Sequence, residues 1–186
     1  MSTSFTEKTI YTINPKIPKL ILTEMLKQCQ SLEFTPSKIS NDDIVSDYRS
    51  STQTWLCWDT WIAGIMHNMF ISANNDYFHY DLHHFDSGIQ VTKYEPNQHY
   101  DWHVDDTPVM NKNAMSRKLS MTFLLNDNFT GGEFEIYQPS TNKNFTYKLN
   151  AGEVCIFPSW VVHRVKPVLS GTRYSLVAWM NGNQFK

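Results

Sequence analysis

The second half of the chain is divided into many short segments of β-forming residues, and this division constrains the fold most strongly. From about residue 77 onward, runs rich in Val, Ile, Tyr, Phe and Thr alternate with turn signals such as Asp86-Ser87-Gly88, Gly131-Gly132 and Ser170-Gly171. We expect strands near residues 77–82, 88–94, 99–104, 118–125, 132–137, 145–149, 153–157, 161–166 and 172–180. Many short strands separated by tight turns are typical of a β-sandwich or barrel.

Two earlier segments have helical rather than β periodicity. Residues 15–30 carry apolar side chains at helical spacing, namely Ile17, Leu20, Ile21, Met25 and Leu26. Residues 54–72 show a similar stripe, which we interpret as core packing: Trp55, Trp58, Ile62, Ile65, Met66 and Met69. We expect both helices to support the back of a sheet. Residues 1–13 are interpreted as an extended lead-in, and residues 31–50 as a polar loop.

Length and composition favour one globular domain that is neither strongly basic nor strongly acidic. The 186 residues suit a single domain, so we expect one domain over 1–186, with helical support over about 14–75 and the β core over about 77–181. A hydrophobic content of 41% is enough for a packed core. The net charge of −2 gives no basic excess, which disfavours a nucleic-acid partner.

The cysteines and the N-terminus indicate the compartment. Cys29, Cys57 and Cys155 are odd in number and widely spaced, which is neither a disulfide framework nor a zinc pattern. We interpret them as buried thiols in a reducing compartment. The N-terminus lacks an apolar signal core, and no apolar run approaches the roughly 18 residues of a membrane span. We therefore expect a soluble, intracellular, cytoplasmic protein without a membrane partner.

The stretch from Tyr94 to Asp106 contains the pattern His103-Val104-Asp105. Residues two apart in an extended strand share one face, so this imidazole and carboxylate could bind one metal ion from the same side. The best candidate for a third ligand is His163, in a distant apolar run. Two His and one carboxylate suit non-heme Fe(II) with open positions. Taken alone, however, His-x-Asp also occurs often by chance.

Other residues near His103 compete for the ligand role. Asp101 has the same strand parity as His103, so spacing alone does not exclude it. Asp106 would point to the opposite face if the strand continues. His99 shares the parity of His103, but four residues of strand separate them by about 13 Å, which is too far for one metal.

Arg173 makes the pattern much more specific. It lies ten residues after His163 in an apolar segment, where a guanidinium needs an anion and its planar fork matches a carboxylate. Ser175 lies on the same strand face and can add a hydroxyl. A His-x-Asp pair, a distant His and then Arg-x-Ser is far less frequent by chance than His-x-Asp alone.

With these residues in view, the chain from about Tyr48 to Trp179 resembles the Fe(II)- and 2-oxoglutarate-dependent dioxygenases, in particular their prolyl 4-hydroxylase-like branch. The motifs that carry the resemblance are Tyr48-Arg49-Ser50-Ser51, Gln90–Tyr94, Tyr100–Asp105, Leu119–Asn126, Gly131–Phe134, Gly152-Glu153, Phe157-Pro158, His163 and Gly171-Thr172-Arg173. Many animal and plant members carry Lys where Arg173 stands, so this form resembles bacterial and viral relatives. The implied fold is mainly β with supporting α-helices, a double-stranded β-helix (a cupin-like jelly roll).

The resemblance also implies roles for individual residues. It selects His103, Asp105 and His163 as the catalytic iron ligands, with Asp105 preferred over Asp101. It places 2-oxoglutarate on Arg173 and Ser175, with Tyr94 helping to hold it, and it places Tyr100 and Arg49 near the substrate. A satisfied core tyrosine remains the alternative for both Tyr94 and Tyr100.

The implied chemistry is hydroxylation of an unactivated C–H bond, with release of succinate and CO2. Its cofactor and cosubstrates would be Fe(II), 2-oxoglutarate and O2, with ascorbate as a candidate reductant. Related halogenases lack the carboxylate, so Asp105 favours hydroxylation. The expected substrate is a peptidyl proline or another protein side chain; the alternatives are a free amino acid, a small metabolite or a nucleobase. From a different class, the chain could be a non-catalytic jelly-roll binding module. Residues 106–117 are either a lid over the substrate or an ordinary surface loop.

Overall fold

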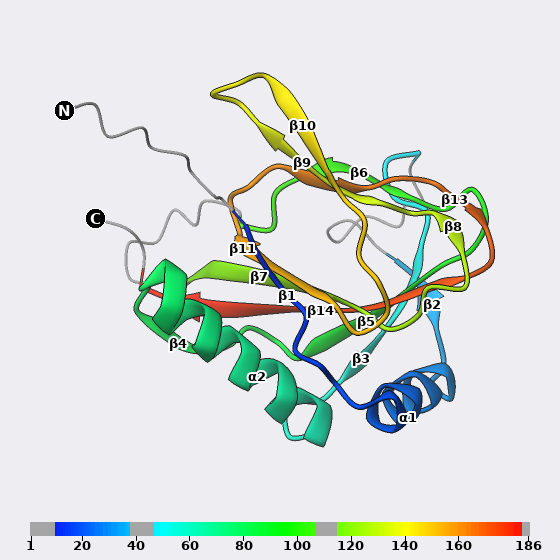
Figure 1. Ribbon diagram of the computed structural model, residues 1–186, viewed down its shortest axis with the longest axis horizontal. Coiled ribbons are helices and arrows are strands. Elements are labelled where there is room, and N and C mark those ends of the chain that lie inside the picture. The colour runs from blue at the N-terminus through cyan, green and yellow to red at the C-terminus, as the bar shows by residue number, and fades with distance from the viewer. Residues whose placement is uncertain (1–9, 38–46, 107–114, 184–186) are drawn as a thin grey trace.

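The computed structural model describes residues 10–37, 47–106 and 115–183 (Figure 1). Within these ranges two antiparallel sheets face each other, and two helices cover the outer face of the larger sheet (Figure 1). The expected double-stranded β-helix with supporting helices is confirmed.

The larger sheet has eight strands in the order β1-β11-β7-β14-β5-β3-β2, with β4 also beside β14. These strands are β1 (Tyr11–Ile13), β2 (Thr35–Pro36), β3 (Thr52–Leu56), β4 (Leu82–Phe85), β5 (Ile89–Tyr94), β7 (Ser116–Leu124), β11 (Val154–Pro158) and β14 (Arg173–Gly182). The smaller sheet, in the order β10-β9-β12-β6, contains β6 (Tyr100–His103), β9 (Phe134–Gln138), β10 (Lys143–Tyr147) and β12 (His163–Val165). A third pair joins β8 (Thr130–Gly131) to β13 (Val168–Ser170).

Strand β14 shows how the larger sheet separates a core from a cleft. Side chains alternate between the faces of a strand. Leu176, Ala178 and Met180 are therefore buried against the helices, while Arg173 and Ser175 face the smaller sheet. The helices α1 (Lys19–Gln30) and α2 (Trp61–Ala73) contribute Met25, Cys29, Ile62, Met66 and Phe70 to this core. Each side chain of this size stabilises the fold by about 1.5–3 kcal/mol when fully buried.

The helix expected from residue 54 starts later, at Trp61. Thr60 caps it, because its hydroxyl oxygen accepts the Ala63 N–H at 3.3 Å. The preceding residues form β3, which pairs with β5 in the register Gln53 to Thr92. Trp55 and Trp58 were expected in the core, but they are 43% and 70% exposed. Cross-strand pairing therefore overrides the helical spacing at Trp55, whereas Trp58 lies in the turn between β3 and the helix.

The strand expected over residues 77–82 is also wrong. A short π-helix, η1 (Asn74–Phe78), follows α2, and β4 starts only at Leu82. The Asn74 side chain accepts the Tyr80 N–H and donates to the Tyr80 carbonyl, both at 2.9 Å. These bonds satisfy backbone groups that a strand would have paired.

Other expectations have mixed outcomes. Residues 11–13 are extended as β1, and the predicted first helix corresponds to α1. Cys29 and Cys155 are buried free thiols, whereas Cys57 is exposed, contrary to expectation. None of the described helices is long and apolar enough to cross a bilayer. Most of the proposed lid, residues 107–114, lies outside the described residues.

Candidate active site

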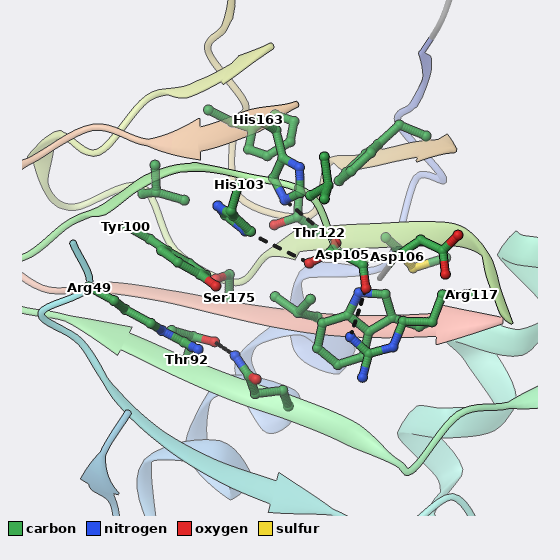
Figure 2. A pocket seen from close by; sticks show the side chains of 18 of the residues that line it. Arg49, Thr92, Tyr100, His103, Asp105, Asp106, Arg117, Thr122, His163 and Ser175 are labelled. Carbon is green, nitrogen blue, oxygen red and sulfur yellow. Dashed lines mark hydrogen bonds and ion pairs between the residues drawn. The ribbon is translucent and has the colours of Figure 1, made fainter. Parts of the chain in front are cut away.

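A cavity of about 920 Å³ lies between the two sheets. Strands β5 and β14 of the larger sheet line one side, and β6 and β12 of the smaller sheet line the other (Figure 2). All eight residues that the sequence singled out line this cavity: Arg49, Tyr94, Tyr100, His103, Asp105, His163, Arg173 and Ser175.

His103 and His163 are held side by side by strand register. They are directly opposite in the β6–β12 pair, and their ring centroids are 4.0 Å apart. The Nδ1 of His103 lies 2.7 Å from the Asp101 carbonyl, and the Nδ1 of His163 lies 2.9 Å from the Val161 carbonyl. An Nδ1–H that donates to a carbonyl leaves Nε2 free as a ligand and fixes the plane of the ring.

Asp105 completes a three-residue group, but not as a strand residue. Strand β6 ends at His103, so the expected shared strand face is wrong at Asp105, which lies on the following turn. Its two carboxylate oxygens lie 3.8 Å from His103 Nε2 and 3.5 Å from His163 Nε2 (Figure 2). These separations exceed hydrogen-bond length. They are slightly wider than the roughly 3 Å between adjacent oxygen or nitrogen ligands that lie about 2.1 Å from one ion.

The three ligand atoms lie within 4.8 Å of one another, and within the described ranges this is the one such group of His, Cys, Asp and Glu side chains. Their protonation also suits a metal. Burial, and then His163, lower the pKa of His103 to about 3. Burial alone would raise the pKa of Asp105, but the neighbouring His163 and His103 outweigh it and lower that pKa. A neutral imidazole and an ionised carboxylate are the forms that bind divalent ions.

The other candidate ligands, Asp101, His99 and Asp106, do not belong to the three-residue group. Asp101 accepts the Trp102 N–H at 2.8 Å through its carboxylate. His99 Nε2 lies 2.7 Å from the Asp47 carbonyl. Asp106 lines the cavity, contrary to the expectation that it points away, because the strand has already ended. It does not belong to the three-residue group.

Arg173 lines the cleft and is 2% exposed. Its Nη1 donates to the Ser175 hydroxyl at 2.7 Å, and its guanidinium carbon is 5.6 Å from the centroid of the Tyr94 ring. Its Nε is buried without a hydrogen-bond partner, and no carboxylate of the described residues forms an ion pair with it. A buried cation without an anion is strongly unfavourable. The arrangement therefore fits a bound carboxylate.

The Gly131-Gly132 turn makes room for the Arg173 side chain. Gly132 has a φ of +64°, and a Cβ there would lie 3.0 Å from the Arg173 Cδ and 3.0 Å from a Val168 methyl carbon. Glycine is therefore required both by backbone conformation and by close approach. The turn that the sequence indicates at Gly131-Gly132 therefore also shapes the site.

Arg49 and Tyr100 form a stack against the first histidine. The guanidinium carbon of Arg49 lies 4.5 Å from the centroid of the Tyr100 ring, and that ring stacks on His103 at 3.5 Å and 14°. The Nη2 of Arg49 donates to Gln53 at 3.0 Å, and no carboxylate of the described residues pairs with it. Burial raises the pKa of Tyr100 to about 12, so its hydroxyl stays protonated.

Sequence reasoning missed several residues that line the cleft. Trp179 could have been found, because it shares strand parity with Arg173 and Ser175. Trp55 was missed because its segment was interpreted as helix. Arg117 and Asp86 form an ion pair at 2.5 Å, but no local pattern connects residues so far apart in sequence.

Comparison with known proteins agrees with this geometry. Residues 89–181, half of the chain, match the family model of the 2OG-Fe(II) oxygenase superfamily. The chain belongs to the 2OG-Fe(II) oxygenase superfamily. The matched range contains the three-residue group and Arg173, whereas Arg49 lies outside it.

One curated relative of the chain is a PKHD-type hydroxylase of Crocosphaera subtropica. It is 33% identical over 95 residues, which are 50% of this chain and 42% of the relative. The chain thus spans less than half the length of the curated relative that it matches.

Two solved structures share the fold of this chain. One is a prolyl hydroxylase from Trichoplax adhaerens in complex with a hypoxia inducible factor peptide fragment. It has a TM-score of 0.77 and 21% identity, covering 94% of this chain and 84% of that one. The other is a Pseudomonas putida prolyl-4-hydroxylase, with a TM-score of 0.74 and 19% identity over 95% and 94% of the two chains.

Proposed function

We propose that this protein is an Fe(II)- and 2-oxoglutarate-dependent hydroxylase of a peptidyl proline. The observation that carries the proposal is Arg173, a buried cation without an anion in the cleft that also contains the His103, Asp105 and His163 group. A generic metal-binding jelly roll has no need for such a cation.

In this proposal Arg173 binds the distal carboxylate of 2-oxoglutarate. Its planar fork offers parallel N–H donors, including the Nε that has no partner. The Ser175 hydroxyl, already 2.7 Å from the guanidinium, lies beside the same carboxylate. Tyr94 is opposite Arg173 in the β5–β14 register and is 3% exposed. Its ring walls the pocket, and its hydroxyl supplies a further hydrogen bond.

His103, Asp105 and His163 would hold the iron. When bound, iron and O2 supply the oxidation of an unactivated C–H bond, coupled to conversion of 2-oxoglutarate to succinate and CO2. Asp105 contributes the negative charge that the divalent ion requires. The carbonyls of Asp101 and Val161 keep the two imidazoles oriented. Because the ligands are largely buried, bulk water is kept from the reacting centre.

The cleft mouth supports a proline-containing peptide as substrate. Aromatic side chains from both sheets line it, including Trp55, Tyr100 and Trp102. Proline-rich segments dock in aromatic-lined grooves in several peptide-recognition modules. Arg49, without a carboxylate partner among the described residues, can donate to a peptide carbonyl beside the reacting ring.

A second candidate substrate is a free amino acid. The same Arg49 guanidinium, 6% exposed and not neutralised by a described carboxylate, could bind an α-carboxylate instead of a carbonyl. An α-carboxylate at this position would form a charge-assisted hydrogen bond with Arg49.

The deciding experiment measures succinate release with Fe(II), ascorbate and O2, and the gain of one oxygen atom in the product by mass spectrometry. The substrates are proline-containing peptides, the same peptides with Pro replaced by Ala, and free amino acids. Turnover that requires peptidyl proline, and that disappears in His163→Ala, supports the proposal. Turnover with free amino acids alone would select the second candidate. Binding of 2-oxoglutarate without turnover of any substrate would favour a non-catalytic binding module.

A further inference from the structure

We infer that Arg117 is a positioning residue for Asp105 and thereby sets the affinity and coordination geometry of the metal site. The inference rests on the proposed function, because it takes Asp105 to be a metal ligand. Arg117 lies near the start of β7 and lines the cleft beside Asp105 and Asp106 (Figure 2).

Asp105 lies outside the sheet, so interactions other than strand pairing must fix its position. Strand β6 ends at His103, so strand register fixes the histidine but not the carboxylate after it. The turn is held first by one carbonyl: the backbone N–H groups of Asp105 and Asp106 both donate to the Ser159 oxygen, at 2.9 and 3.0 Å. Ser159 is fully buried, and its hydroxyl oxygen accepts a hydrogen bond from the Ser120 hydroxyl at 2.9 Å.

Arg117 makes a further hydrogen bond that fixes this turn. Its Nη1 donates to the Asp105 carbonyl at 3.3 Å. Its Nε and Nη2 donate to one carboxylate oxygen of Asp86, at 2.9 and 2.5 Å. All three guanidinium nitrogens thus donate hydrogen bonds, which fixes the orientation of the group.

Asp86 is itself anchored to β14. Its second carboxylate oxygen accepts the side-chain N–H of Asn181 at 3.0 Å, and its backbone N–H donates to the Trp179 carbonyl at 3.0 Å. Burial alone would raise the pKa of Asp86, but Asn181 and Arg117 outweigh it and lower that pKa. The ion pair therefore remains charged at neutral pH.

Trp179 connects the ion pair to the ligand side chain. The Arg117 guanidinium carbon lies 4.0 Å from the centroid of the indole. The indole Nε1 is buried and makes no hydrogen bond of good geometry with a described residue, yet the Trp179 side chain helps to lower the pKa of Asp105. Arg117 thus holds the backbone of Asp105 directly and stacks on the ring that faces its carboxylate.

Positioning and simple electrostatics predict opposite effects on metal affinity. Removing a cation near the site would by Coulomb's law strengthen the binding of a divalent cation. Loosening a ligand would weaken it, and outer partners of metal ligands typically contribute 10- to 100-fold in affinity. The sign of the change therefore separates the two roles.

The chain offers a matched control in Arg164. It donates to Glu135 through Nε at 2.8 Å, forms an ion pair at 2.6 Å, and lies 4.4 Å from the centroid of Trp102. Its side chain is 30% exposed, against 29% for Arg117. Mutation of Arg164 therefore removes a comparable ion pair and cation–π contact. Unlike Arg117, however, Arg164 makes no hydrogen bond to Asp105.

The experiment titrates Co(II) anaerobically into wild type, Arg117→Met, Arg117→Lys and Arg164→Met, recording affinity and the visible spectrum of bound Co(II). We expect affinity to fall about 10- to 100-fold in Arg117→Met, with an altered spectrum, and to be unchanged in Arg164→Met. Arg117→Lys keeps a charge but cannot reach Asp86 and the Asp105 carbonyl with a planar fork, so it should also lose affinity. It serves as the test variant if Arg117→Met does not fold.

Unchanged or stronger Co(II) binding in the folded Arg117 variant would overturn the inference. An equal loss in Arg164→Met would overturn it too, because the effect would not be specific to Asp105. Failure of the wild type to bind Co(II) would instead contradict the proposed function, so the two failures are distinguishable.

Discussion

His163 lies directly opposite His103 across the β6–β12 pair, with their ring centroids 4.0 Å apart. This register, rather than proximity in sequence, brings two imidazoles separated by sixty residues to one point. The Asp105 carboxylate reaches toward both rings from the turn after β6.

Replacing either histidine should remove the metal site. His163→Ala leaves only two of the three ligands, so we expect Mn(II) binding, followed by electron paramagnetic resonance, to be lost. His99→Ala is the matched control, because His99 is bonded to the Asp47 carbonyl and lies outside the three-residue group. Wild-type Mn(II) affinity in His163→Ala would remove this residue from the ligand set.

Arg173→Met should weaken 2-oxoglutarate binding without changing metal affinity. The loss of a buried, charge-assisted pair corresponds to about 2–5 kcal/mol, which is roughly 30- to several-thousand-fold in the dissociation constant. Calorimetry with Mn(II) in place of iron measures both quantities. Arg173→Lys retains the charge but not the fork and should give an intermediate affinity. If Arg173→Met bound 2-oxoglutarate as tightly as wild type, the cosubstrate would have to lie elsewhere.

Gly132→Ala should reduce both stability and 2-oxoglutarate affinity. A non-glycine residue in left-handed conformation is unfavourable by roughly 1–2 kcal/mol, and the new methyl would contact the Arg173 side chain at 3.0 Å. For a chain of this length we expect the Tm to fall by about 2–8 °C.

Gly64→Ala is the control for that substitution. It lies inside α2, and a Cβ there meets no atom within 4 Å. Alanine should stabilise the helix by roughly 0.5–1 kcal/mol. A Gly132→Ala protein as stable as Gly64→Ala would show that the turn tolerates a side chain.

Glu135 should make stability depend on pH in the acid range. Burial alone would raise its pKa, but the Arg164 and Thr146 hydrogen bonds outweigh it and lower that pKa in the folded protein. A lowered pKa stabilises the fold above the unfolded value of about 4.3, and this stabilisation is lost as pH falls through the folded pKa. Glu135→Gln should therefore have a lower Tm than wild type at pH 7, and the difference should shrink below about pH 4. A difference that stays constant between pH 7 and pH 3 would contradict this assignment.

Much of the β core could be predicted from sequence because its strands follow a simple alternation. Arg173 and Ser175 share a face of β14 with Trp179, while Leu176 and Ala178 face the helices. A pattern that alternates every second residue indicates directly which side chains share a face of the strand. The sequence correctly predicts that Asp105 lies close to His103, but for the wrong reason. The prediction rests on a shared strand face, whereas in the structure a turn after β6 brings the two side chains together.

The remaining features depend on contacts that no local pattern records. The segment around Trp55 has helical spacing, but pairing with β5 makes it a strand. Arg117 and Asp86 are 31 residues apart, and Asp86 and Asn181 are 95 apart. Only the assembled fold shows that these residues surround Asp105.

The most direct test of the proposed cofactor site is an anaerobic calorimetric titration of 2-oxoglutarate with and without Mn(II). If the cosubstrate bridges Arg173 and the His103, Asp105 and His163 group, Mn(II) should raise its affinity, and Asp105→Ala should abolish that increase while weaker, Arg173-dependent binding remains. Equal affinity for 2-oxoglutarate in wild type with and without Mn(II) would contradict the existence of one joint site for metal and cosubstrate.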